Sequence, residues 1–151
     1  MISGRFPSLD KQFGMWSSTM EKGFYTNSFH VDVDSHISAF EKLQIEGPFH
    51  TLSNGGCISY VELKEAPLHN VEALEDLISY GAKNGVHYLG INFPLDICKH
   101  CGAQGVFDRC PECNSDSLKH IRRVSGYLEI RDYFTLGKKA EECHRRENML
   151  K

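Results

Sequence analysis

The clearest periodic pattern along the chain predicts a helix over residues 71–84. Its apolar residues recur at helical spacing: Val71, Leu74, Leu77 and Ile78. Asn70 is suited to cap the first turn, and acidic residues follow where the helix dipole favours anions. Gly85 provides a stop at the other end. The pattern therefore predicts one well-bounded amphipathic helix.

Two stretches that favour strands flank this helix. Residues 57–63 ("CISYVEL") follow a Ser-Asn-Gly-Gly turn sequence, and residues 86–92 ("VHYLGIN") end at a Phe-Pro pair. Strands that alternate with helices are typical of α/β proteins. We therefore expect a strand–helix–strand unit and an α/β fold.

The N-terminal part of the chain has weaker patterns. Residues 1–23 lack a clear period, and we expect them to be irregular. Residues 24–34 alternate apolar and polar side chains, which predicts a strand with Phe29 and the two following valines on one face. Residues 37–47 fit either a short helix or an irregular crossing between strands.

Composition changes after residue 94. Residues 95–120 carry few large apolar side chains and contain four cysteines, which marks a boundary. The segment 121–130 is typical of strand and turn, and residues 138–149 favour a charged helix. The sequence thus predicts three parts: 1–94, 95–120 and 121–151.

The totals fit one compact globular domain or a piece of a larger protein. The 151 residues are 40% hydrophobic and 25% charged, with a net charge of −3. This balance, without aromatic residues interleaved among basic ones, argues against nucleic acid as the main partner. No apolar run reaches the ~18 residues of a membrane span, and the N-terminus lacks the pattern of a signal peptide. We therefore expect a cytoplasmic protein without a membrane partner.

Four cysteines have the spacing of a metal site. The pattern C-x2-C-x8-C-x2-C is formed by Cys98, Cys101, Cys110 and Cys113. Two residues between thiolates let a tight turn aim both sulfurs at one point, and two such turns complete a tetrahedron for Zn²⁺. Four cysteines also close the metal shell, so we expect a structural zinc rather than a catalytic one. Iron held as in rubredoxin is the alternative.

Residues around the cysteines refine this hypothesis. Gly102 and Asn114 follow the second cysteine of each pair, where a left-handed backbone turns N–H groups toward sulfur. His100 and His120 lie nearby in the sequence, and we interpret both as exposed polar residues. The predicted ligand set is therefore the four cysteines alone.

The segment "RVSGY" (residues 123–127) resembles the radical loop of the glycyl radical enzymes, which also lies near the C-terminus. A four-cysteine site directly before it narrows the resemblance to the anaerobic (class III) ribonucleoside-triphosphate reductases. Further segments resemble that family in the same order: "YTNSFHVDV", "FEKLQIEGPF", "HYLGINFPLDIC" and "FTLGKKAE". The resemblance covers most of the chain.

This resemblance implies a fragment of the α/β barrel of a glycyl radical enzyme. Residues 1–94 would supply closing barrel elements, 95–120 a zinc-ribbon-like module, and 121–151 the radical loop and a C-terminal helix. Gly126 would store the radical, because only glycine lets the α-carbon flatten without a side-chain clash. In the family, an activating enzyme that uses S-adenosylmethionine and an iron–sulfur cluster removes the hydrogen atom from this carbon.

The resemblance also implies what this chain lacks. The family reduces ribonucleoside triphosphates through a thiyl cysteine on a barrel loop far upstream of the radical loop. Neither Cys57, interpreted as a buried inert thiol, nor Cys143 matches that cysteine. We therefore expect the chain to be inactive alone and to need a larger barrel portion. A separate subunit, a replacement domain and a piece of a longer chain all fit.

One residue departs from the family pattern, and one alternative function is open. The second residue after the tyrosine of the motif is usually small, and here it is Glu129. A carboxylate beside a loop that enters a dry barrel needs a partner, for which Arg122 and Arg131 are the candidates. The alternative is a zinc-ribbon binding module without radical chemistry, which explains the cysteines but leaves RVSGY to chance.

Overall fold

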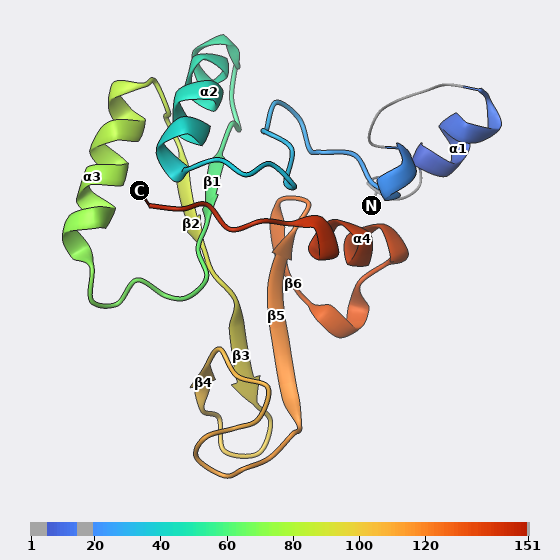
Figure 1. Cartoon of the computed structure of the whole chain (residues 1–151), viewed down its shortest axis with the longest axis vertical. Coiled ribbons are helices and arrows are strands. Elements are labelled where there is room, and N and C mark those ends of the chain that lie inside the picture. The colour runs from blue at the N-terminus through green and yellow to red at the C-terminus, as the bar shows by residue number, and fades with distance from the viewer. Residues whose placement is uncertain (1–5, 15–19, 151) are drawn as a thin grey trace. The chain divides into compact units, whose positions relative to one another are not determined.

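The computed structural model describes residues 6–14 and 20–150 (Figure 1). It contains helices and strands in mixed order, which confirms the predicted α/β class. The barrel, and the functional division at residues 94 and 120, stay predictions. No helix among the described residues combines the length and apolar character needed to cross a bilayer.

The described chain forms two compact units. One, here called the βαβ unit, comprises Thr26–Asn92 and His144–Lys151. The other, here called the hairpin unit, comprises Met1–Tyr25 and Phe93–Cys143. Each unit is therefore built from segments far apart in the sequence, and the two are described separately below.

The predicted strand–helix–strand unit is confirmed. The strands β1 (Ser59–Glu62) and β2 (Leu89–Asn92) pair in parallel, and α3 (Val71–Lys83) connects them. The Asn70 side chain accepts a hydrogen bond from a backbone N–H of the first turn of α3. Gly85, with a φ of 84°, lies just beyond the other end. Both strands are shorter than the predicted stretches.

Of the two alternatives for residues 37–47, a short helix or an irregular crossing, the structure has a helix, α2 (Ala39–Leu52). Its start is fixed by a capping box, in which the Ser38 hydroxyl accepts the Glu41 N–H and the Glu41 carboxylate accepts the Ser38 N–H. The two distances are 3.1 and 2.9 Å. Local hydrogen bonds thus determine where this helix begins.

The buried face of α2 carries three polar side chains among its six residues. Glu46 is fully buried; Lys42 donates to its carboxylate, and His30 lies 3.4 Å from it. Burial alone would raise the pKa of Glu46, but His30 and Lys42 outweigh it and lower the pKa to about 2. One turn further on, His50 Nε2 lies 2.9 Å from the Ser59 hydroxyl. Paired polar groups therefore fill this part of the βαβ unit.

Gly47 lets α2 and α3 approach closely, which gives a first prediction. A Cβ at this position would lie 2.1 Å from the backbone oxygen of Asn84, just beyond α3. We expect Gly47→Ala to destabilise the chain by about 1–3 kcal/mol, because backbone must move to admit the methyl group. Urea unfolding measures this change. The exposed Gln44→Ala on the same helix is the control, and equal stability of the two variants would contradict the prediction.

The predicted strand over residues 24–34 is wrong. Backbone hydrogen bonds to the carbonyls of Asn27 and Asp32 close two turns in this segment. The Val31 N–H donates to the Glu46 carboxylate at 3.0 Å instead of to a neighbouring strand. The segment therefore alternates polar and apolar side chains without forming a strand. Its backbone groups form hydrogen bonds within turns and with a side chain of α2.

The hairpin unit is built on a four-stranded antiparallel sheet. Its strand order is β4–β3–β5–β6. The strands are β3 (Leu95–Cys98), β4 (Gln104–Gly105), β5 (Leu118–Val124) and β6 (Tyr127–Ile130). One end of β5 lies beside the cysteine loops and the other leads into the turn that contains Gly126. A single strand therefore joins the two candidate sites.

Two short elements correct the expectation of irregular structure over residues 1–23. They are α1 (Phe6–Gln12) and the 3₁₀ turn η1 (Met20–Lys22). Seven residues make about two helical turns, which is too few for a hydrophobic period to show. Residues 1–5 and 15–19 lie outside the described part of the chain.

The C-terminal helix begins and ends earlier than predicted. After the 3₁₀ turn η2 (Arg131–Tyr133), α4 covers Leu136–His144 instead of residues 138–149. The residues that follow are extended, and the Asn148 N–H donates to the Glu62 carbonyl. The carbonyl of Met149 accepts the Ala39 N–H. The helix ends here because the tail, itself part of the βαβ unit, forms hydrogen bonds with other residues of that unit.

Candidate metal centre and glycine hairpin

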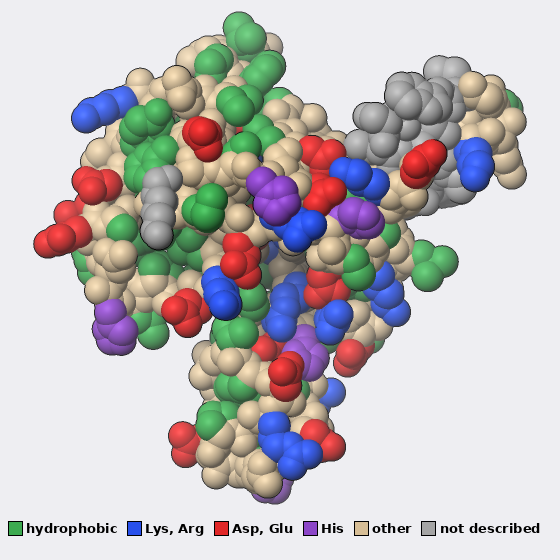
Figure 2. All heavy atoms as spheres, in the orientation of Figure 1, with side chains coloured by type: hydrophobic (Ala, Val, Ile, Leu, Met, Phe, Trp, Pro, Cys, Tyr) green, Lys and Arg blue, Asp and Glu red, His purple; other side chains and the backbone are tan. Residues whose placement is uncertain are grey.

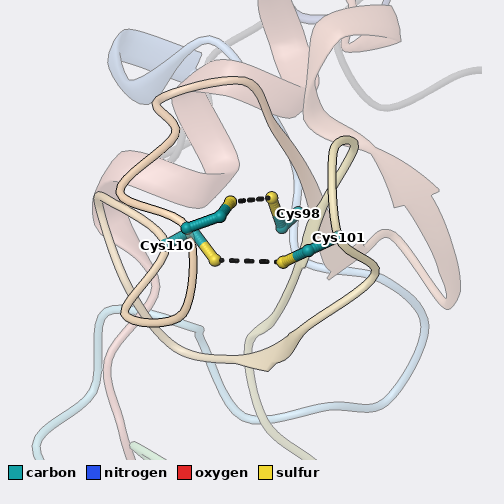
Figure 3. A group of neighbouring side chains, drawn as sticks. Cys98, Cys101 and Cys110 are labelled. Atoms are coloured by element: carbon teal, nitrogen blue, oxygen red, sulfur yellow. Dashed lines mark hydrogen bonds between the residues drawn. The ribbon is translucent and has the colours of Figure 1, made fainter.

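The four predicted cysteines lie together at the end of β3. Their sulfur atoms all lie within 4.8 Å of one another, and Figure 3 shows three of them directed toward a common point. The Cys98–Cys113 and Cys101–Cys110 sulfur distances are 3.5 and 3.4 Å. A tetrahedral zinc with Zn–S bonds of ~2.3 Å needs sulfurs about 3.8 Å apart. The donor set therefore fits zinc in size and chemistry.

Each cysteine pair lies in a loop with the same backbone pattern. The Cys98 N–H donates to the Ala103 carbonyl, and the Cys110 N–H donates to the Ser115 carbonyl, both at 2.9 Å. Gly102 and Asn114 have φ angles of 79° and 56°, as predicted for the positions after each pair. The left-handed residue reverses the chain, so that both cysteines of a pair face inward.

The pKa values of the cysteine thiols are shifted in opposite directions. The backbone N–H of Cys101, with that of His100, lowers the pKa of the Cys98 thiol to about 6. At Cys113 the Ser115 N–H favours the thiolate, but burial and the other sulfurs outweigh it and raise the pKa to about 12. One thiolate thus forms readily, whereas the full set of four needs a cation to balance their charge.

The cysteine module has almost no other core. Buried Cys98 and Cys110 pack with Leu118, and the partly buried Phe107 covers them. Two of the proposed ligands are thus also the centre of the small apolar cluster. A bound metal would supply most of the cohesion of this module.

Asp96 connects the cysteine module to β5 through hydrogen bonds that the sequence did not predict. This buried carboxylate accepts hydrogen bonds from His120 and Arg122, both at 2.7 Å, and from the Phe107 N–H at 3.0 Å. Burial would raise the pKa of Asp96, but Arg122 and His120 lower it. His120 is therefore not simply exposed, which corrects that expectation, whereas His100 is exposed as predicted.

Gly126 lies in the turn between β5 and β6. Val124 and Tyr127 are paired across the hairpin, so the loop contains only Ser125 and Gly126. Their φ angles are 51° and 102°, the positive signs of a type I′ hairpin turn. The glycine that interrupts a strand-like sequence is thus explained locally by the turn.

The partner of Glu129 differs from both candidates named from the sequence. Arg122 faces Glu129 across the ladder but donates to Asp96, and Arg131 donates to Glu142. The buried Lys138 of α4 donates to the Glu129 carboxylate. Burial works against a charged Lys138, but Glu129 and Tyr127 raise its pKa. The carboxylate is therefore paired, through a helix that comes later in the sequence.

The remaining cysteines lie outside the four-sulfur cluster. Cys57 is only partly buried, and Cys143 is exposed on α4. The expectation of a buried thiol at Cys57 is therefore corrected to a partly buried one, because Cys57 lies just before β1 begins rather than inside the strand.

Comparison with known proteins identifies the family. A family model described as "Anaerobic ribonucleoside-triphosphate reductase" matches residues 1–148. The chain belongs to this family. Curated reductases of the same name are similar to it: one from Escherichia coli is 40% identical over 161 residues, and one from Haemophilus influenzae is 42% identical over 161 residues. The reductase of Enterobacteria phage T4 is 39% identical over 153 residues.

These reductases are much longer than this chain. The matches to the two bacterial reductases cover 99% of the chain but only 22% of each relative, and the phage match covers 93% and 25%. A solved structure named "Anaerobic ribonucleotide reductase" aligns with a TM-score of 0.78 at 20% identity, over 97% of this chain and 23% of that one. This structural likeness shows that the fold is shared.

Proposed function

We propose that the chain is the C-terminal, radical-bearing part of an anaerobic ribonucleoside-triphosphate reductase, with the radical stored on Gly126. One observation carries the proposal. In a chain that belongs to this family, the RVSGY segment folds as a hairpin with Gly126 in its two-residue turn. A turn presents its backbone at the end of the sheet, where another part of the enzyme can reach it.

The chemistry requires glycine for two reasons. A radical on the α-carbon is stabilised when that carbon flattens and shares the unpaired electron with the adjacent amide groups. Gly126 has no side chain to oppose this change, and its φ of 102° is already one that other residues rarely adopt. Radical formation removes one hydrogen atom from the carbon and leaves no formal charge there. The proposed activating partner is an enzyme that uses S-adenosylmethionine and an iron–sulfur cluster.

We further propose a structural zinc held by the four clustered cysteines. Four thiolates leave no coordination position for substrate, which supports a folding role rather than a catalytic one. The thin apolar core around Cys98 and Cys110 supports the same conclusion. Zinc would hold the loops together at the base of β5, the strand that leads into the turn of Gly126.

A larger barrel portion is the third proposed component. Three apolar residues of α2 recur at helical spacing yet are 45–79% exposed: Ile45, Phe49 and Leu52. Figure 2 shows hydrophobic side chains gathered over α2 and α3. These exposed apolar side chains of α2 are suited to contact the part of the enzyme that the longer relatives contain. That part would bind the ribonucleoside triphosphate and supply the thiyl cysteine.

The proposal predicts that activity depends on this larger portion. The chain treated anaerobically with an activating enzyme should form no deoxynucleotide from ribonucleoside triphosphates. Addition of a barrel portion truncated before these residues should start turnover, measured by chromatography of the nucleotides. Deoxynucleotide formation by the rigorously purified chain, or its absence from the reconstituted mixture, would contradict the proposal. A barrel portion with its own intact radical segment is the positive control.

A further inference from the structure

The turn that contains Gly126 is held by a side chain from α4. Glu141 is only 4% exposed, and both of its carboxylate oxygens bind Ser125. One oxygen accepts the Ser125 backbone N–H at 2.9 Å, and the other accepts the Ser125 hydroxyl at 2.5 Å. The carboxylate therefore binds both the backbone and the side chain of the residue that precedes the glycine.

Ser125 needs such a contact because of its backbone. Its φ of 51° is in the left-handed region, which serine adopts at an energetic cost and for which Asn, Asp or Gly are the usual residues of a two-residue turn. A hydrogen bond to the Ser125 N–H opposes rotation of that residue toward negative φ. Because Ser125 and Gly126 share a peptide bond, the same contact also sets the direction of the Gly126 α-carbon.

Other contacts link α4 to β6 and to η2 instead of to the turn. Lys138 donates to Glu129 and lies 4.8 Å from the centre of the Tyr127 ring. Arg131 donates to Glu142 at 2.9 Å, on a more exposed part of the surface. Glu141 is thus the residue of α4 best placed to act on the turn. Its neighbour Glu142 provides a matched control on the same helix.

We propose that Glu141 is a positioning residue for the Gly126 radical and that it acts through Ser125. This inference rests on the proposed function of Gly126. Glu141 does not touch the reacting carbon; it holds the turn in the shape that presents the α-hydrogen of Gly126 for removal. Loss of the carboxylate would let Ser125 relax and would remove this acceptor from its partly buried N–H.

The decisive experiment compares Glu141→Leu with Glu142→Leu in the chain reconstituted with its barrel portion and activating enzyme. We expect the initial rate of radical formation, measured by electron paramagnetic resonance, to fall about tenfold or more in Glu141→Leu. It should be unchanged in Glu142→Leu. Glu141→Gln should retain most of the rate, because the amide can accept the Ser125 N–H and donate to its hydroxyl.

A second substitution separates positioning from a general loss of folding. Glycine adopts positive φ without strain, so Ser125→Gly should restore much of the rate when combined with Glu141→Leu. A merely structural role of Glu141 in packing α4 predicts no such rescue. Wild-type rates in Glu141→Leu, or a failure of Ser125→Gly to restore them, would overturn the inference.

Amide hydrogen exchange tests the contact without radical chemistry. In the full chain, the Ser125 amide should exchange about tenfold or more faster in Glu141→Leu than in the wild type, and unchanged exchange would overturn the inference. Absence of a radical in the wild-type mixture would instead overturn the proposed function. The exchange result alone would then decide whether Glu141 holds the turn.

Discussion

Air should cut the activated chain at Gly126. When the radical has formed anaerobically on this carbon, dioxygen adds to it, and decay of the resulting peroxyl breaks the backbone there. The expected product is a long piece ending at the glycine and a short piece of residues 127–151. Intact-mass measurement under denaturing conditions, before and after exposure to air, detects both. This is the largest expected effect, because it converts every radical-bearing chain into two pieces.

The control for this cleavage is Gly126→Ala. Alanine adds a side chain to a residue with a φ of 102° and opposes flattening of the α-carbon, so neither a radical signal nor air-dependent cleavage should appear. Cleavage that persists in the alanine variant would place the radical on another residue. So would a strong radical signal in the wild type that leaves the chain intact in air.

Replacement of two buried cysteines should remove the metal and unfold the cysteine module. The wild-type chain should contain one zinc, and Cys98→Ser combined with Cys110→Ser should contain none. Structural zinc contributes roughly 10–16 kcal/mol in zinc-finger peptides, which exceeds or matches the ~5–15 kcal/mol that stabilises a whole domain. Because both cysteines also centre the local apolar cluster, few other contacts remain to hold the loops.

Elemental analysis and amide hydrogen exchange over residues 95–120 measure these two effects. Cys57→Ser is the matched control, since Cys57 lies outside the four-sulfur cluster, and it should keep one zinc per chain. Unchanged metal content in the double variant would refute the ligand assignment. Iron in place of zinc would keep the ligands but correct the metal.

Local signals in the sequence predicted some elements well and others poorly. α3 was predicted nearly to its ends because Asn70 and Gly85 act on adjacent backbone, whatever the rest of the chain does. The strand expected over residues 24–34 failed because Val31 donates to Glu46, a residue on a distant helix. A period of two describes side chains, whereas a strand also requires a neighbouring backbone.

α2 shows a second limit of sequence patterns. Its buried positions include Lys42, Glu46 and His50, while Ile45 and Phe49 are exposed. Polar residues at buried positions and apolar residues at exposed ones obscure the helical period, so the segment could not be distinguished from an irregular crossing. Exposed apolar residues on this helix are expected if the proposed larger portion of the enzyme covers them.

In the candidate site, too, local features could be predicted from the sequence and long-range contacts could not. The spacing of the cysteines and the residues after each pair are local features, and they predicted the cluster and its left-handed turns. The contacts Asp96–His120, Glu129–Lys138 and Ser125–Glu141 each join residues 9–24 positions apart. The first depends on the register of β3 and β5, and the other two on how α4 packs against the hairpin, which no short pattern in the sequence encodes.

The extended tail after α4 would hold the two pieces of a chain cut at Gly126 together. The short piece begins with β6, which remains hydrogen-bonded to β5, and its Glu141 still holds Ser125 of the long piece. Near its other end, Asn148 and Met149 pair with Glu62 and Ala39. A nicked protein would therefore stay assembled and keep its native size in gel filtration. Damage by oxygen would then be detected only after denaturation separates the two pieces.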